Sequence, residues 1–287
     1  MISKPGMGWV RDIPDTNDYT EKSAKVQEFF EKKRILSSPL SSSDEVIIPE
    51  SDFSPIEDQE SIGSCTANAG IGLVEYYQNK TKGKYIDMSR LFLYKATRNL
   101  LNWTGDTGAY LRTTMQAMVL FGAPPESYWP YDISNYDVEP PAFAYSFAKE
   151  FQTVRYVRVD PPRISTDKLL ERIKSFINRK MPMMFGFSVY NSISQANSSG
   201  EIPYPCSNDR RAGGHAVVAT GYDNNKVIKN SNCGLTTKGA IRIRNSWGTG
   251  WGDGGYGWLP YKYIEAGLAV DWWTLIRSEW INLDVFD

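Results

Sequence analysis

The only histidine of this 287-residue chain, His215, lies in the apolar stretch GGHAVV at residues 213–218. Imidazole is the side chain that titrates near neutral pH, so any acid–base chemistry by an imidazole rests on this one residue. A histidine inside an apolar run is more often a buried structural residue than a catalytic one. Its interpretation therefore depends on the reactive groups elsewhere in the chain.

Cys65 stands at the start of a segment, residues 65–80, in which apolar side chains recur at helical spacing. The free amides and the dipole at a helix N-terminus stabilise a thiolate, which is the nucleophile that acyl transfer needs. A small buried cysteine is the alternative. Gln59, six positions earlier, carries an amide that could donate to an oxyanion beside the Cys65 N–H, or it is a surface glutamine.

A third segment, IRIRNSWGTGWG at residues 241–252, places Asn245 where a predicted strand meets a glycine-rich turn. An asparagine oxygen can accept a hydrogen bond from an imidazole N–H and fix the orientation of the ring. Trp247 would then cover that bond and exclude water. The alternative is a turn asparagine, with the tryptophans and glycines serving the core and the turn.

Helices dominate the first half of the chain and strands the second. The apolar pattern predicts helices over residues 65–80, 89–101, 110–121 and 166–180, and short strands over 183–190, 216–222, 226–229, 240–244 and 272–276. This segregation favours an α+β fold over alternating strands and helices. Cys65 is therefore expected on a helix, and His215 and Asn245 on strands.

The first 48 residues differ from the rest. Residues 8–9 and 12–15 look turn-like, residues 21–36 form a charged segment that is compatible with a helix, and the serine-rich stretch 37–44 is a linker by composition. The segment is either a mobile tail or a pro-segment with a cleavable joint. We expect residues 1 to about 45 to lie over or near the active-site cleft and to slow substrate entry.

The net charge of −1 gives no basis for binding nucleic acid or an anionic membrane surface. No apolar run is long enough to span a bilayer, and the first twenty residues lack the apolar core of a signal peptide. We therefore expect neither nucleic-acid nor membrane partners, and a protein that is cytoplasmic or exported by a non-classical route.

The three cysteines do not form a disulfide framework. Together with a single histidine they lack the short spacings of a zinc site, so we expect no bound metal and no cofactor. Cys206 and Cys233 flank the predicted strand of His215. They form either one bridge that ties a loop to the β-rich half or two free thiols.

Taken together, these segments resemble the papain-like cysteine peptidases. The matching motifs are Gln59, GSC at 63–65, GHA at 214–216, GY at 221–222, and NSWG at 245–248 followed by WG at 251–252. The resemblance covers about residues 50–287. It implies that Cys65 is the nucleophile, His215 the base and then the acid, Asn245 the orienting residue and Gln59 the oxyanion donor, with a thiolate–imidazolium pair in the resting enzyme.

The resemblance also implies a two-domain papain-like fold with the active-site cleft between the domains. We expect a pro-segment-like region and linker at 1–48, a mainly helical left domain at 49–150 and a β-barrel-like right domain at 151–287. Gly108, Gly214 and Trp247 are the expected substrate-binding residues. Gly108 would allow close approach of a substrate backbone, although its segment also fits an ordinary turn before a helix.

The implied function is that of a monomeric cysteine endopeptidase, made as a zymogen, which hydrolyses proteins or peptides through a thioester. An exopeptidase or a peptide ligase of the same family is the nearest alternative. A non-catalytic binding or storage protein on this fold is less favoured, because every catalytic position is filled. Three departures from the family pattern mark a divergent branch: Glu60 replaces a common glycine, Ile62 a disulfide cysteine and Thr66 a common tryptophan.

Overall fold

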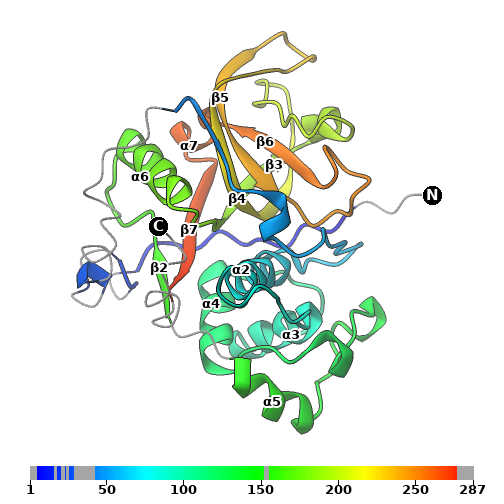
Figure 1. Ribbon diagram of the computed structural model, residues 1–287. Coiled ribbons are helices and arrows are strands. Elements are labelled where there is room, and N and C mark those ends of the chain that lie inside the picture. The colour runs from blue at the N-terminus through cyan, green and yellow to red at the C-terminus, as the bar shows by residue number, and fades with distance from the viewer. Residues whose placement is uncertain are drawn as a thin grey trace.

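The computed structural model describes residues 5–15, 18–20, 23, 26–28, 43–151 and 155–276. Most of the predicted helix at 21–36 and of the linker at 37–44 lies outside these residues. Helices fill one half of the molecule and a sheet the other, and the blue N-terminal trace passes between them (Figure 1). None of the described helices is both long and apolar enough to cross a membrane.

Four described helices build the helical half, and three of them were predicted. They are α2 (Cys65–Lys82), α3 (Arg90–Leu100), α4 (Leu111–Leu120) and the short α5 (Ala142–Ala148). Ser89 caps α3 by accepting the Phe92 N–H at 3.1 Å. Gly83 ends α2 in the left-handed conformation. At seven residues, α5 is too short to show a helical period in the sequence.

Helix α2 lies between the helices and the sheet, with every residue from Cys65 to Gln78 buried. Small residues permit this position. A Cβ on Gly70 would stand 3.3 Å from Met118 of α4, and one on Gly72 would stand 3.1 Å from the Arg244 guanidinium of the sheet half. Helix α2 is therefore held at the boundary between the two halves (Figure 1).

The other half is an antiparallel sheet of seven strands in the order β2-β7-β3-β4-β5-β6, with β1 paired to β4. The strands are β1 (Glu45–Ile47), β2 (Arg155–Arg158), β3 (Met183–Tyr190), β4 (Arg211–Lys229), β5 (Thr236–Arg244), β6 (Tyr256–Pro260) and β7 (Ala269–Ile276). Helices α6 (Thr166–Asn178) and α7 (Tyr261–Glu265) accompany it. The α+β class is confirmed, and within the described residues the sheet does not close into a barrel.

Five 3₁₀ turns connect the elements of the described chain: Glu50–Asp52, Glu126–Tyr128, Ile133–Asn135, Lys149–Phe151 and Asn191–Ala196.

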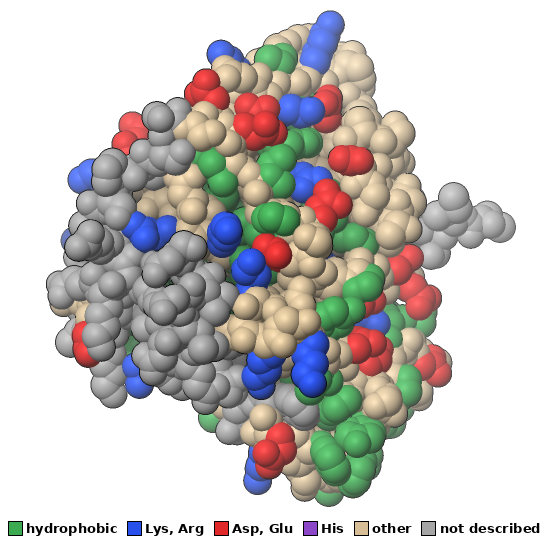
Figure 2. Space-filling view, viewed as in Figure 1, with side chains coloured by type: hydrophobic (Ala, Val, Ile, Leu, Met, Phe, Trp, Pro, Cys, Tyr) green, Lys and Arg blue, Asp and Glu red, His purple; other side chains and the backbone are tan. Residues whose placement is uncertain are grey.

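Acidic and basic side chains are interspersed on the face shown in Figure 2. Hydrophobic side chains gather at its lower end, where Phe143 and Phe147 of α5 are exposed. No large field of one sign covers the described part of this face.

The pairing of β4 with β5 positions the predicted site. Val218 lies opposite Arg244, so the same antiparallel register carries the residues after Arg244 alongside His215. On its other side, β4 pairs with β3, where His215 lies opposite Phe187. His215 is thus held within β4, paired with β3 on one side and next to the segment that follows β5 on the other.

Strand β7 contributes to both hydrophobic cores. Trp272 stacks on Phe185 in the sheet core, with ring centroids 3.9 Å apart and 6° between the planes. Its neighbour Trp273 belongs to the cluster formed with the helices. This follows from the alternation of side chains along a strand, and it joins the two halves through buried aromatic surface.

Candidate active site

Cys65 is the first residue of α2 and is fully buried. The thiol lies against the backbone amides of Ala216 and Gly8. Burial raises the pKa of Cys65 to about 11, although the amides of Ala216, Gly8 and Thr66 act in the opposite direction. In this form of the protein the sulfur is therefore a neutral thiol at neutral pH.

His215 is oriented by Asn245. Its Nε2 lies 2.7 Å from Asn245 Oδ1, which also accepts the backbone N–H of Ser246 at 2.8 Å. Because Asn245 Oδ1 is an acceptor, Nε2 carries the proton and Nδ1 is left with its lone pair. No described residue gives Nδ1 a hydrogen bond. The geometry leaves Nδ1 free to act as a base.

Burial also sets the charge of the imidazole. It lowers the pKa of His215 to about 4, while the hydrogen bond to Asn245 acts in the opposite direction. The sequence predicted a resting thiolate–imidazolium pair, but in this buried arrangement both groups are neutral. Both charged forms are disfavoured because neither sulfur nor imidazole is in contact with water.

Trp247 covers the imidazole. Its indole stacks on the His215 ring with centroids 4.4 Å apart and 26° between the planes, and Trp251 packs edge-on against Trp247. Phe187 meets the same imidazole edge-on at 5.9 Å. This aromatic enclosure keeps water from the bond between His215 and Asn245, as the sequence predicted for Trp247.

Gln59 is fully buried beside this group. Its Oε1 accepts the Ser246 hydroxyl at 2.7 Å, and its Nε2 donates to the carbonyls of Ile62 at 2.9 Å and Gly6 at 3.0 Å. The hydrogen bond from Ser246 thus fixes the orientation of the Gln59 amide, with Oε1 toward Ser246 and Nε2 toward the carbonyls of Ile62 and Gly6. The donor expected to hold an oxyanion is engaged with a carbonyl of the N-terminal segment.

Residues 6–10, here called the N-terminal strap, lie between the two halves of the molecule. On the helical side, Ala109 donates to the Gly8 carbonyl at 2.8 Å and accepts from Val10 at 3.1 Å. On the sheet side, Trp9 donates to the Gly214 carbonyl at 3.1 Å. The strap pairs with the backbone on both sides, which explains why Cys65 and His215 are inaccessible to solvent.

The strap approaches Cys65 closely because it contains glycines. A Cβ on Gly8 would stand 1.8 Å from the Gly63 carbonyl oxygen, and one on Gly6 would stand 2.0 Å from that of Ile62. The expected turn at residues 8–9 is wrong: Trp9 instead forms a parallel bridge with Ala109. The group that Gly8 presents to the thiol is an N–H, a hydrogen-bond donor without electrophilic character.

A charged cluster fixes the chain just beyond the strap. Arg112 of α4 binds both Asp12 and Asp18, and Arg158 of β2 binds Asp18 at 3.2 Å. Burial acts to raise the pKa of Asp18, but these guanidinium groups hold it below its usual value. The ion pairs tie Asp12 to the helical half and Asp18 to both halves of the molecule.

Asp106 holds the loop that precedes Cys65. Its Oδ1 accepts the Gly63 N–H at 2.8 Å and the Tyr94 hydroxyl. Gly108 in turn donates its N–H to the Tyr94 oxygen at 3.0 Å. Gly108 has φ of 73°, and a Cβ on it would stand 2.0 Å from the Gly8 carbonyl oxygen. The backbone that approaches Gly108 here is that of the strap, and substrate binding by Gly108 stays a prediction.

The structure brings the expected residues together in different ways. Gly108 and Gly214 contact the strap, whereas Trp247 packs on His215. Ser246 was not predicted, although it lies within the NSWG motif, and neither was Trp9, whose indole contacts distant strands. Of the departures, Glu60 adopts φ of 55° where the family pattern has glycine, and Thr66 accepts a hydrogen bond from Thr114.

Cys206 and Cys233 form a disulfide, with Cα atoms 6.2 Å apart, and Cys65 is the free cysteine. The question that the sequence left open is thus answered by geometry. The bridge joins the two loops that flank β4, the strand that carries His215. It stabilises the sheet half without contacting the site.

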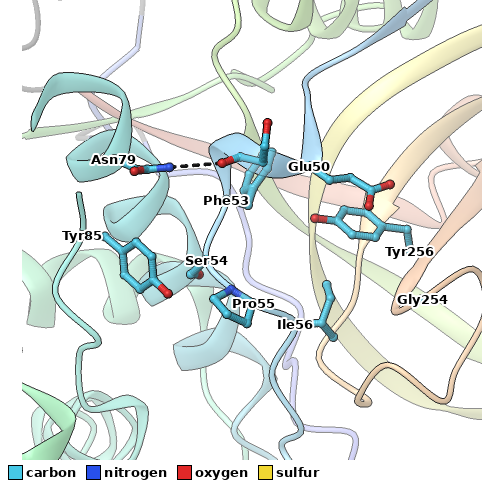
Figure 3. A pocket seen from close by; sticks show the side chains of 10 residues that line it. Glu50, Phe53, Ser54, Pro55, Ile56, Asn79, Tyr85, Gly254 and Tyr256 are labelled. Atoms are coloured by element: carbon cyan, nitrogen blue, oxygen red, sulfur yellow. Dashed lines mark hydrogen bonds between the residues drawn. The ribbon is translucent and has the colours of Figure 1, made fainter. Parts of the chain in front are cut away.

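An open pocket of about 480 Å³ lies away from this site (Figure 3). Its wall is formed by residues 50–51 and 53–56 together with Asn79, Tyr85, Gly254 and Tyr256. Asn79 lies 14 positions beyond Cys65 on α2, which is about 20 Å along a helix axis. The pocket contains neither of the two reactive side chains, so it is separate from the Cys65 site, which the strap fills.

Comparison with known proteins gives one consistent result. The model of the papain family cysteine proteases matches residues 43–271. An uncharacterized peptidase C1-like protein of Acanthamoeba polyphaga mimivirus is 34% identical over 249 residues, which cover 79% of this chain and 76% of that protein. A cysteine protease of Blomia tropicalis is 28% identical over 223 residues, covering 74% of this chain and 59% of the relative.

Solved structures agree with this. Xylellain, a cysteine protease from Xylella fastidiosa, superposes with a TM-score of 0.74 at 29% identity, covering 96% of this chain and 98% of that one. Digestive procathepsin L 3 of Tenebrio molitor has the same fold, with a TM-score of 0.62 at 17% identity, over 94% of this chain and 84% of that one.

Proposed function

The chain belongs to the papain family of cysteine proteases, and we propose that it is an endopeptidase that uses Cys65 as its nucleophile and is inhibited by its own N-terminal strap. In this proposal residues 1–48 form the inhibitory segment and linker, residues 49–150 carry the nucleophile, and residues 151–287 carry His215 and Asn245. The chain acts as a monomer, because a single copy supplies each proposed catalytic group.

The proposed reaction begins when the strap leaves the cleft. His215 Nδ1 accepts the thiol proton of Cys65, and Asn245 holds the protonated Nε2 of the same ring. The sulfur attacks a peptide carbonyl. Gln59 Nε2 and the Cys65 N–H stabilise the resulting oxyanion. Protonated His215 then protonates the leaving amine, and water hydrolyses the thioester.

The path of the strap through the cleft is the observation that supports endopeptidase activity. It enters at Gly6, beside Gln59, passes the thiol at Gly8 and continues through Val10 to the ion pair between Asp12 and Arg112. A continuous chain therefore fits through the cleft past the nucleophile in both directions. An exopeptidase needs a group that stops the substrate at one end of the cleft, and residues 6–12 meet no such stop among the described residues.

Inhibition by the strap is supported by the groups it occupies. The Gly6 carbonyl accepts a hydrogen bond from Gln59, the proposed oxyanion donor. The Gly8 N–H lies against the thiol of Cys65, and the Trp9 N–H donates to the Gly214 carbonyl. A substrate requires the same space, so it cannot bind until the strap is displaced. This state fits a zymogen, in which the proposed nucleophile is also un-ionised.

Peptides blocked at both ends test the proposal. The full-length Gly8→Ala protein is incubated with such peptides, and products are identified by mass spectrometry. We expect two fragments whose masses sum to that of the peptide plus one water, and no products with Cys65→Ala in the same background. A matched peptide with free ends that loses residues from one end, while the blocked peptide stays intact, indicates an exopeptidase. Joined fragments without added water indicate a ligase.

A further inference from the structure

The indole of Trp9 is buried in a pocket of the sheet half. It lies across three adjacent strands, β7, β3 and β4. A Cβ on Gly186 of β3 would stand 1.9 Å from the indole carbons, and one on Gly214 of β4 would stand 2.8 Å from them. Because both positions are glycine, the pocket has flat backbone walls that accommodate a large planar ring.

Asp271 of β7 forms the polar end of this pocket. It is fully buried, and its Oδ2 accepts the Trp9 indole N–H at 3.1 Å. Its Oδ1 accepts the Trp273 indole N–H at 2.7 Å and lies 3.4 Å from Arg158. When Trp9 leaves, Oδ2 loses this donor and becomes available to a substrate side chain.

Arg158 decides what kind of donor the pocket favours. It pairs with Asp271 and also with Asp160, whose carboxylate accepts the backbone N–H groups of Asp271 and Trp272. Burial raises the pKa of Asp271 to about 6, whereas the charge of Arg158 and the hydrogen bonds from the two indoles act in the opposite direction. Asp271 thus already has a positively charged partner inside the protein.

We infer that Asp271 makes this pocket selective for a flat aromatic substrate side chain with an N–H donor, namely tryptophan. This inference rests on the proposed peptidase function. Phenylalanine fits the walls but leaves Oδ2 unpaired, which is costly in a buried site. Lysine and arginine bring a positive charge that Arg158 already supplies. Since Trp9 is adjacent to Gly8, the selected residue lies within two positions of the scissile bond.

The test uses full-length protein that carries Gly8→Ala, which is expected to displace the strap, together with Trp9→Ala, which vacates the pocket. Blocked peptides that differ only by Trp, Phe, Lys or Arg at each position within two residues of the scissile bond are compared at pH 7. We expect kcat/KM for tryptophan at one position to exceed that for phenylalanine by about ten-fold, and lysine and arginine to be poorer. Equal rates for tryptophan and phenylalanine, or a preference for a cation, would overturn the inference while leaving the peptidase assignment intact.

The matched variant is Asp271→Asn in the same background. Asp271 has φ of 66°, a conformation that asparagine tolerates. Trp273 and Arg158 both donate toward Oδ1, so the asparagine oxygen stays there and its NH₂ replaces Oδ2. Two donors then face each other, and the preference for tryptophan should disappear. A preference that persists in a folded Asp271→Asn protein excludes this role for Asp271.

A second readout needs no peptidase activity. Trp9→Phe keeps a ring but removes the donor, so we expect faster alkylation of Cys65 by iodoacetamide, by about ten-fold. In the Asp271→Asn background the indole N–H faces an NH₂ group, so the same Trp9→Phe change should not accelerate alkylation. If the two substitutions act independently, the hydrogen bond does not contribute and the inference fails.

Discussion

The side-chain amide of Gln59 donates from Nε2 to the carbonyl oxygen of Gly6 at 3.0 Å. Gln59 lies six positions before Cys65, the first residue of α2, whereas Gly6 belongs to the strap. The protein thus places one of its own carbonyls on the donor that we assign to the oxyanion. Inhibition and catalysis are expected to compete for the same hydrogen bond.

Gly8→Ala should displace the strap. The new Cβ would stand 1.8 Å from the backbone oxygen of Gly63, which cannot move aside as a flexible side chain would. We expect the rate of Cys65 alkylation by iodoacetamide to rise by about ten-fold or more, the factor that corresponds to losing one or two net hydrogen bonds of the strap. Gly250→Ala is the matched control, because a Cβ there meets no atom within 4 Å. Equal rates in Gly8→Ala and wild type would mean that the strap does not limit access.

Gln59→Ala in the Gly8→Ala background should lower kcat by about 10²-fold, the usual effect of losing one oxyanion donor. Ser246→Ala removes the hydroxyl that orients Gln59 at 2.7 Å. We expect it to cause a smaller loss, of about ten-fold, with little change in KM. Steady-state kinetics on one blocked peptide measures both. If both variants raise KM and leave kcat unchanged, Gln59 binds substrate in the ground state instead.

Glu75 of α2 predicts a pH dependence of stability. Burial raises its pKa to about 7, although its contacts with Ser54, Met88 and Arg244 oppose the rise. A carboxyl whose pKa is raised on folding stabilises the protein fully below its unfolded pKa, and this contribution is lost as pH rises through the folded pKa. Relative to Glu75→Gln, the wild type should therefore gain at most about 3 kcal/mol between about pH 8 and about pH 4.5. Urea unfolding across that range measures the difference, and a flat difference contradicts it.

The disulfide should matter for stability and not for the site. Cys206 and Cys233 are 27 positions apart, and closing a loop of that length contributes roughly 3 kcal/mol in the chain-entropy model. We expect Cys206→Ser with Cys233→Ser to lower the free energy of unfolding by up to that amount. The alkylation rate of Cys65 should stay the same. A large change in that rate would show that the bridge also positions the strap.

Local patterns predicted the elements that carry the site. The helix that begins at Cys65 and the strand 183–190 occur where the sequence indicates. Short contiguous motifs singled out Gln59, His215 and Asn245, which lie in one hydrogen-bonded region of the structure. The two strands predicted at 216–222 and 226–229 are one continuous strand, β4. They were predicted as two because the residues at the register shift between Asp223 and Val227 look like a turn in the sequence.

Long-range contacts could not be predicted in this way. Trp9 and Asp271 are 262 positions apart, and no local pattern relates them. The neutral state of Cys65 and His215 also escaped prediction, because it depends on burial by a segment that the sequence marked only as unusual. The path of the strap became evident only from its backbone contacts.

Reaction of Cys65 with a cysteine-peptidase epoxide is the decisive measurement for the proposed catalytic pair. Full-length Gly8→Ala protein is treated at about pH 7, with His215→Ala in the same background as the control, and the modified residue is mapped by peptide mass spectrometry. We predict a single adduct on Cys65, formed about 100-fold more slowly without the imidazole. No adduct, or an adduct on Cys65 that forms equally fast without His215, would contradict the assignment of this pair.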